Sequence, residues 1–365
     1  MTGYVAATAA RRRGGGLLLP VTLVLAACTA QRPITAVKAS PAGPPSSPAL
    51  QVVVSLPPGN GPAVVQAIAT GPVAPIAFAT ATVSCPAGTA LIGGGIRASV
   101  KGGGTPSPSQ HFVGAFPSTS DGIAATASAG SPSSWTAIGA TGAQPVPDAN
   151  TTALGVCDRR PAGTPTPQLI VKSTPGPFAA ASSARATAVC PSGTALVGGG
   201  ADAGLRKGWP PPPSLHITAS FPSDPAGNAL RFGGRPNAWT AVAATGGAPL
   251  TGAATTAYAL CGTRPATGPM VVKSAIGPSG AATSFRVTAR CPDGSILVFG
   301  GASTGLTQGG NDPPQGLHLR GTFPSDAAGH PIDGAAAAWT AVAEAGGLLT
   351  LGARTTAFAV CSSQP

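Results

Sequence analysis

Short stretches in which apolar and polar residues alternate recur along the chain, and this pattern predicts β-strands. The clearest stretch is residues 285–291, where every second residue from Phe285 to Cys291 is apolar and the residues between them are arginine or threonine. Successive side chains of a strand point to opposite faces, so the apolar set with its cysteine forms the buried face. We therefore predict an all-β protein with inward-facing cysteines.

The strand pattern occurs three times, with a period near 100 residues. A Cys-Pro-x-Gly motif followed by a glycine-rich stretch begins at Cys85, Cys190 and Cys291. In each copy 22 residues separate the tryptophan of a later Trp-Thr-Ala motif from a closing cysteine. These landmarks predict three repeats, at residues 62–163, 164–267 and 268–365, each about the size of an independent domain.

Each repeat reads as a small antiparallel β-sandwich or barrel. The best-defined strands are residues 215–221, 255–261 and 317–323. Three tandem modules are the expected architecture, and one threefold β-prism or trefoil built from all three repeats is the alternative. An immunoglobulin topology is disfavoured because Trp135 lies 50 residues after Cys85, whereas the immunoglobulin tryptophan follows its cysteine on the next strand. The glycine triplets indicate a bulge or a close approach of another backbone.

Six of the seven cysteines fall in equivalent pairs within the repeats. We expect three disulfides, Cys85–Cys157, Cys190–Cys261 and Cys291–Cys361, each closing a loop of about 70 residues. Pairing between modules stays open, because spacing alone does not fix connectivity. The tryptophans of the repeats, Trp135, Trp239 and Trp339, are expected in the core beside small alanines.

The first 27 residues are typical of a secretory signal peptide. Arg11–Arg13 form a basic segment, and the apolar run from Leu17 to Ala27 is too short to span a bilayer. Either general secretion or twin-arginine export fits this leader. The sequence Leu25-Ala26-Ala27-Cys28 at its end resembles the lipobox of bacterial lipoproteins. That resemblance implies a diacylglycerol on Cys28 and a membrane anchor of acyl chains on the extracytoplasmic face.

The array of Cys-Pro-x-Gly, Phe-Pro-Ser, Trp-Thr-Ala and a closing cysteine also resembles uncharacterised secreted repeats of high-GC bacteria. This resemblance implies a location outside the cytoplasm and no particular activity. Residues 28–61 are rich in proline, alanine and serine, a composition that favours an extended tether between membrane and repeats.

The charge of the chain indicates loose attraction to anionic surfaces. The formal charge is +11, and removal of three leader arginines leaves +8. The arginines, including Arg97, Arg286 and Arg320, are dispersed along the sequence and form no basic stripe with aromatics. Membrane, envelope polymers or glycans are therefore the expected partners, and nucleic acid is not.

Few residues suggest chemistry. His111, His216 and His318 lie five residues before the phenylalanine of each Phe-Pro-Ser, so we expect them exposed on the opposite face. In a threefold arrangement they are weak candidates for a shared metal such as zinc. Asp121, Asp224 and Asp326 fit turns, the last two being weak binding candidates together with Trp209.

No enzyme, catalytic residue or cofactor is expected. Glu344 is the only glutamate, so catalysis by paired carboxylates would depend on aspartates alone. The sequence predicts a lipid-anchored surface protein with a binding, adhesive or envelope-structural role. A secreted hydrolase or metal-binding protein that uses a threefold repeat arrangement is the alternative. The oligomeric state is not indicated.

Overall fold

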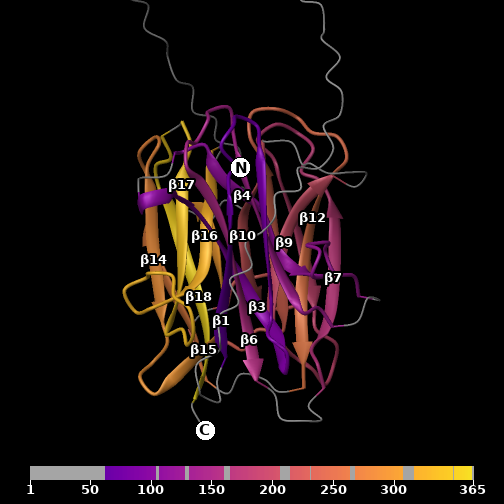
Figure 1. The fold of residues 1–365 in the computed structure, drawn as a ribbon. Helices are drawn as coiled ribbons and strands as arrows, with labels where there is room; N and C mark the ends of the chain where they lie inside the picture. Colours follow the sequence, from indigo (N-terminus) through magenta and orange to yellow (C-terminus); the bar gives the residue numbers. More distant parts are fainter. Residues whose placement is uncertain are drawn as a thin grey trace, which may run out of the picture. The chain divides into compact units, whose positions relative to one another are not determined.

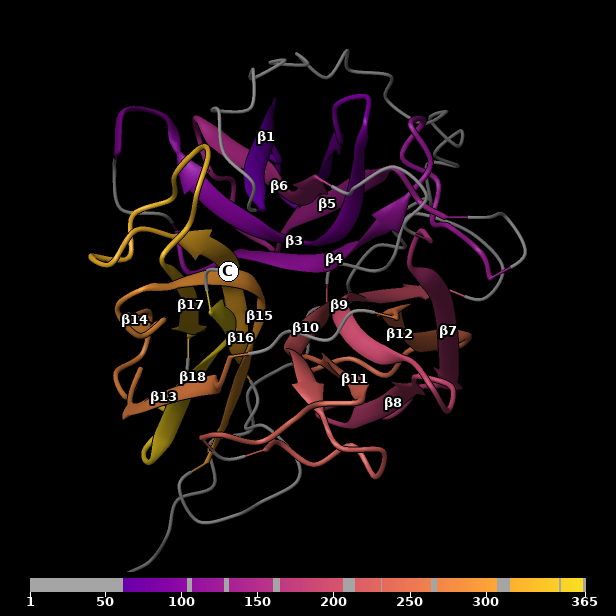
Figure 2. The same ribbon diagram turned by 90° about the horizontal axis from the view of Figure 1, so that it is seen from below.

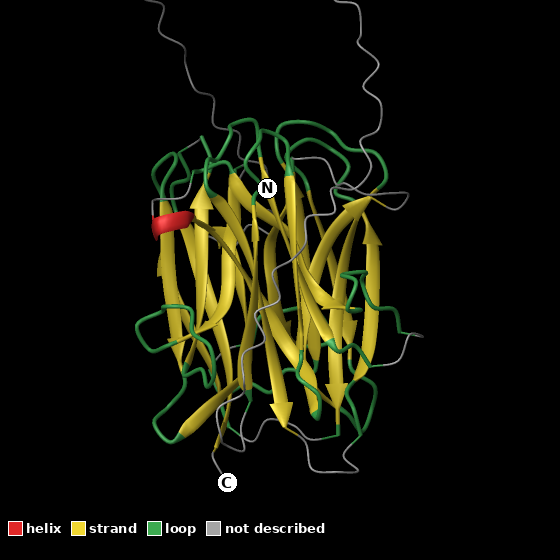
Figure 3. Ribbon diagram, viewed as in Figure 1, coloured by secondary structure: helices red, strands yellow, loops and turns green. Residues whose placement is uncertain are grey.

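The computed structural model describes residues 62–103, 107–127, 131–159, 165–205, 214–230, 232–263, 268–306, 316–347 and 349–363. These residues form an all-β body with one turn of 3-10 helix at Lys101–Gly103, as Figure 3 shows. The predicted leader, Cys28, the tether and Trp209 lie outside the described residues. Within the described ranges, no helix has the length and apolar character needed to cross a membrane.

Eighteen strands build three six-stranded antiparallel sheets (Figure 1). Sheet A contains, in spatial order, β1 (Ala63–Thr70), β6 (Ala149–Arg159), β3 (Thr89–Val100), β16 (Leu317–Ser325), β17 (Ala338–Ala345) and β14 (Ser284–Arg290). Sheet B contains β2 (Phe78–Ser84), β5 (Ser134–Thr141), β4 (Gln110–Ser118), β9 (Ala195–Leu205), β12 (Ala253–Gly262) and β7 (Gln168–Pro175). Sheet C contains β13 (Met270–Ile276), β18 (Ala353–Ser363), β15 (Ser295–Leu306), β10 (Leu215–Ser223), β11 (Ala238–Thr245) and β8 (Ser183–Val189).

Each repeat supplies three strands to each of two sheets. Module 1 (β1–β6) shares sheet A with module 3 (β13–β18) and sheet B with module 2 (β7–β12), while modules 2 and 3 share sheet C. Figure 2 shows the three modules grouped around a common centre, and we call the line through that centre the pseudo-threefold axis. The prediction of an all-β chain of three disulfide-stapled antiparallel modules is confirmed. The modules are not separate beads, because strands pair across every boundary.

Within a module, the two half-sheets face each other across an apolar core. In module 1, β1 packs on β2 and β5 packs on β6, and the other modules repeat this arrangement. The predicted core tryptophans fill the space between the layers, since Trp135, Trp239 and Trp339 are at most 2% exposed. Many of their neighbours are fully buried alanines, such as Ala137 and Ala241. The small side chains leave room for one indole in each module.

The three predicted disulfides are confirmed, and each joins two sheets. Cys85 follows β2 of sheet B and is bonded to Cys157 on β6 of sheet A. Cys190–Cys261 and Cys291–Cys361 repeat this arrangement in modules 2 and 3. Each bond therefore ties the two layers of one module together, and no disulfide of the described part links two modules.

The glycine triplets do three different things. A side chain on the middle glycine would overlap the indole of the same module, at Gly94, Gly199 and Gly300 alike. A side chain on the third glycine would overlap the neighbouring module's backbone, as at Gly301 against the Ser220 carbonyl.

At the first position the three modules meet one another. A Cβ on Gly93 would lie 3.5 Å from Cβ of Phe299 and 3.8 Å from Cα of Gly198. These three residues occupy equivalent positions, because each is paired with the residue before a closing cysteine or its bulge partner. The predicted close approach is confirmed, and bulges lie beside Gly93 and Phe299 as well.

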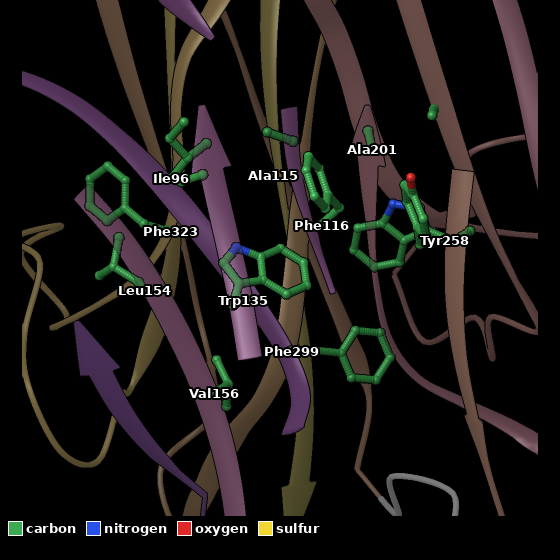
Figure 4. Close-up of a cluster of buried hydrophobic side chains, with 14 of the residues drawn as sticks. Ile96, Ala115, Phe116, Trp135, Leu154, Val156, Ala201, Tyr258, Phe299 and Phe323 are labelled. Carbon is green, nitrogen blue, oxygen red and sulfur yellow. The ribbon is translucent and has the colours of Figure 1, made fainter. Parts of the chain in front are cut away.

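Aromatic side chains seal the junctions between modules. Phe116 of module 1 stacks on Tyr258 of module 2, with ring centroids 5.6 Å apart. Phe221 of module 2 stacks on Phe358 of module 3 at 5.3 Å. Figure 4 shows Phe323 of module 3 beside Leu154 of module 1, which has no ring to stack. Buried apolar surface therefore joins the modules in addition to the strand pairing.

Candidate functional site

Three histidines, one from each module, meet at the pseudo-threefold axis. His111, His216 and His318 lie near the starts of the equivalent strands β4, β10 and β16, which contact one another. Their ring centroids are 5.7–6.0 Å apart in all three pairs, with edge-to-face geometry. Each residue is buried, with 5–7% of its surface exposed. We call these residues the histidine triad.

The expectation that these histidines are exposed was wrong, and a β-bulge explains why. It rested on the odd spacing of five residues between each histidine and its phenylalanine. In β4 the register shifts between Phe112 and Gly114, so one extra residue enters the strand. His111 then pairs with Ala140 and Phe116 with Thr136, four residues apart on β5, so both lie on one face. Equivalent bulges occur in β10 and β16.

The ring orientations are set by the backbone. In each ring Nδ1 lies 3.0–3.2 Å from the carbonyl two residues earlier, at Ser109, Ser214 or Gly316. A carbonyl only accepts, so Nδ1 carries the proton and donates it. Nε2 of His111 and of His318 is buried and has no hydrogen-bond partner.

The triad is held in its neutral form. Burial lowers the pKa of His111 to about 4. Burial, with the nearby His111, lowers the pKa of His216 to about 3. The same causes, in the same order, hold the pKa of His318 well below its ordinary value. At neutral pH the three rings are therefore uncharged packing partners.

As they stand, the described residues contain no group of three or more His, Cys, Asp or Glu side chains arranged to hold a metal ion. The triad satisfies one condition for a shared metal, since its members are close together. Its edge-to-face rings leave the second condition, three nitrogens directed at one point, unmet.

A second cluster lies at the junction in sheet A. Arg97 on β3 pairs with Gly321 on β16, Gly321 pairs with Val342 on β17, and Val342 pairs with Arg286 on β14. Arg320 is the extra residue of the bulge that precedes Gly321. We call Arg97, Arg286 and Arg320 the arginine rung. The dispersed arginines of the sequence are thus brought together by strand pairing.

One carboxyl group lies at the arginine rung. The Nε atom of Arg320 lies 3.2 Å from Oε2 of Glu344, and both side chains are largely buried. Burial raises the pKa of Glu344 to about 8, an effect that the charge of Arg320 partly opposes. This carboxyl therefore balances at most one of the three guanidinium charges. Sequence inspection missed the cluster because its members are about 24 to 220 residues apart, and only the pairing of β3 with β16 joins them.

The equivalent junctions of the other sheets carry different side chains. In sheet C, Ser303 and Thr218 replace Arg97 and Arg320, and Arg185 is equivalent to Arg286. The smaller residues leave a groove of about 240 Å³ there, lined also by Phe221 and Asn228.

In sheet B, Asp202 stands at the position of Arg97. Its Oδ1 is buried without a hydrogen-bond partner. Burial raises the pKa of Asp202 to about 7, partly opposed by a hydrogen bond from the backbone of Ala203. The three junctions thus share one backbone geometry and differ in charge.

The aspartates after Phe-Pro-Ser organise turns, as predicted for Asp224 and Asp326. Asp224 Oδ1 accepts a hydrogen bond from the backbone of Asn228, and Asp326 Oδ1 accepts from Ala328 and His330, each at 2.8 Å. These bonds, listed by atom first, lower the pKa of both carboxyl groups. Asp121 lies in the equivalent turn of module 1. A turn role accounts for these residues without a ligand.

One catalytic-motif match was overlooked in the expectation of no enzyme. Residues Gly301–Gly305 have the Gly-x-Ser-x-Gly spacing of a nucleophile elbow. An elbow needs a sharp strand-to-helix turn, whereas this segment lies inside the continuous strand β15. Ser303 is paired on both sides, with Ala219 and Thr356. The segment therefore does not form a nucleophile elbow.

Comparisons with known proteins give no relatives from which a role could be transferred. No protein-family model matches the chain, and no curated protein matches its sequence. The functional argument therefore depends on the sites described above.

Proposed function

We propose that the protein is a lipid-anchored extracytoplasmic protein that binds a polymer of the cell envelope without catalysis. The observation that carries this proposal is the groove in sheet C, where modules 2 and 3 meet. Its lining combines a guanidinium, an amide and hydroxyl groups with the ring of Phe221. Polar groups around an aromatic floor suit the hydroxyls and the apolar faces of sugar rings.

The compartment is supported by the disulfides and by the leader. Disulfides persist in oxidising surroundings outside the cytoplasm, and all six cysteines of the repeats are paired. The odd cysteine, Cys28, is the residue that the lipobox resemblance assigns to lipid. Mass spectrometry of the mature N-terminus from the native host tests this anchor. A mass that fits a diacylglyceryl Cys28 supports it, and an unmodified Cys28 contradicts it.

The binding function is tested on the mature chain, residues 28–365, with Cys28→Ser to remove the lipid. We expect measurable binding to at least one member of a panel of neutral and acidic envelope glycans. Thr218→Trp, which fills the groove, should weaken binding of a neutral glycan that uses it. The exposed substitution Val73→Trp, on module 1, is the matched control. A protein that binds no glycan of the panel would overturn the proposal.

A second candidate function, metal binding, is favoured by the convergence of the histidine triad. An ion at the axis would require the rings to turn so that three nitrogens face one point. Thermal unfolding with and without Zn²⁺ at pH 7.5 tests it. A rise in Tm for the native chain that is lost in His216→Gln supports the site. An unchanged Tm rejects it.

A further inference from the structure

The arginine rung concentrates positive charge on the outer face of sheet A. Arg286 is exposed and Arg97 is partly exposed, whereas Arg320 is buried between them. Paired positions place Arg97 and Arg286 on one line across four strands, with Arg320 beside the middle of that line. The cluster therefore has a buried base and two flexible sides that open to solvent.

The guanidinium groups are close enough to affect one another. Burial first, and then the charge of Arg286, lower the pKa of Arg97. Burial also lowers the pKa of Arg320, with Glu344 opposing this and Arg286 and Arg97 adding to it. Nη1 of Arg320 is buried and has no hydrogen-bond partner. A buried donor without an acceptor is costly, so this atom provides a place for an anionic oxygen.

The position of the rung matches the groove of sheet C. Arg185, Thr218, Ala219, Val242 and Ser303 of that groove are equivalent in strand register to Arg286, Arg320, Gly321, Val342 and Arg97. The same backbone recess is thus lined by hydroxyls at one junction and by guanidinium groups at the other.

The surroundings indicate what kind of anion fits. Glu344 already places one carboxylate oxygen 3.2 Å from Arg320 Nε, so a carboxylate is compatible with the base of the site. Guanidinium groups bind planar carboxylates through two parallel hydrogen bonds. Hydroxyl side chains lie nearby on the same face, at Ser99 next to Arg97 and at Thr288 next to Arg286, and both keep some exposure.

We propose that the arginine rung binds the carboxylate of an acidic polysaccharide. This inference rests on the proposed envelope-binding function and names its ligand class. Sugar hydroxyls would contact Ser99 and Thr288, while the carboxylate lies between Arg97 and Arg286 above Arg320. The groove of sheet C would accommodate neutral parts of the same polymer.

The experiment measures binding of the mature Cys28→Ser chain to three probes by isothermal titration calorimetry. Polygalacturonate supplies carboxylates, poly(glycerol phosphate) supplies phosphates on a flexible backbone, and dextran is neutral. We expect the tightest binding to polygalacturonate, with an affinity that falls as salt is raised from 20 to 500 mM, values chosen to span roughly 20 to 4 Å of screening length.

Arg97→Gln and Arg286→Gln should each weaken polygalacturonate binding roughly 10-fold, since each loses a charge-assisted contact. Arg290→Gln is the matched control, because it removes the same charge from an exposed position on β14, four residues from Arg286. Its affinity should stay within about 2-fold of the parent, as expected for a distant charge in salt. Tm measurements on each variant check that the fold is retained.

Glu344→Gln gives a change in the opposite direction. Removing the competing carboxyl should strengthen polygalacturonate binding, which mere loss of structure cannot do. If the parent binds polygalacturonate but Arg97→Gln and Arg286→Gln bind equally well, the site is wrong and the binding function stands. Stronger binding of poly(glycerol phosphate) or dextran would overturn the carboxylate assignment. Failure to bind all three probes overturns this site, and the wider glycan panel decides the function itself.

Discussion

Gly94 lies against the indole of Trp135, so that a Cβ at residue 94 would stand 2.6 Å from the ring atom Cε2. The same contact occurs between Gly199 and Trp239 and between Gly300 and Trp339. The middle glycine of each triplet and the tryptophan of the same repeat therefore form one packing unit.

Gly94→Ala should destabilise the protein by about 1–3 kcal/mol, the usual cost of forcing an extra group into a packed core. Chemical denaturation measures the change. Gly305→Ala on β15 is the control, because a Cβ there meets no atom within 4 Å. Equal stability of the two variants would show that the indole can move aside.

Replacing Cys190 and Cys261 together with alanine should lower the free energy of unfolding by about 4 kcal/mol, because the bond closes a long loop in the unfolded chain. Denaturation of the double variant measures this loss. Peptide mapping without reduction should recover the three bonds within modules in the native chain. A bond between modules would contradict the arrangement.

Acid should destabilise the fold through the histidine triad. The folded-state pKa values of His111 and His216, about 4 and about 3, lie below the ordinary value of 6.5. The unfolded chain therefore binds more protons below pH 6.5, and the free energy of unfolding falls as pH drops from 6.5 toward 3. Denaturation midpoints between pH 7.5 and 4 measure this slope.

The control for the acid effect is one residue at a time. In His216→Gln the slope should be smaller than in the native chain, because one buried titrating group is gone. His330→Gln, in an exposed turn, should keep the slope of the native chain. An identical slope in all three proteins would show that other groups cause the acid sensitivity.

Asp202→Asn should stabilise the protein at alkaline pH. Burial raises the pKa of Asp202 from 3.8 to about 7, so the folded form keeps a proton that the unfolded chain releases between these values. The stability contributed by this group is therefore lost as pH rises from 3.8 to 7. Denaturation should show a gain of about 1–3 kcal/mol at pH 8 and little gain at pH 4. A loss of stability at both pH values would contradict this.

Local features of the fold could be predicted from the sequence. Alternation located the strand that ends at Arg290, and equal spacing paired Cys85 with Cys157. Trp135 was assigned to the core because alanines share its face. These features depend on residues near one another in sequence or on a spacing that is repeated, so one chain carries enough information to find them.

Features that depend on pairing between modules could not be predicted. The bulge beside Val113 changes which face His111 occupies, and no residue type marks a bulge. The pairing of Arg97 with Gly321 joins strands more than 200 residues apart. Alternation predicts that these strands form and which residues share a face, but it does not say which strands become neighbours.

Phe299 has a consequence for the origin of the molecule. It occupies the axial position that Gly93 and Gly198 hold in the other modules. Three phenylalanines would overlap in this space, and three glycines would leave a void in a close-packed interior. A ring of three identical repeats could satisfy neither condition. Joining the repeats in one chain fixes the ratio of one large to two small residues, so the copies can no longer be exchanged for one another.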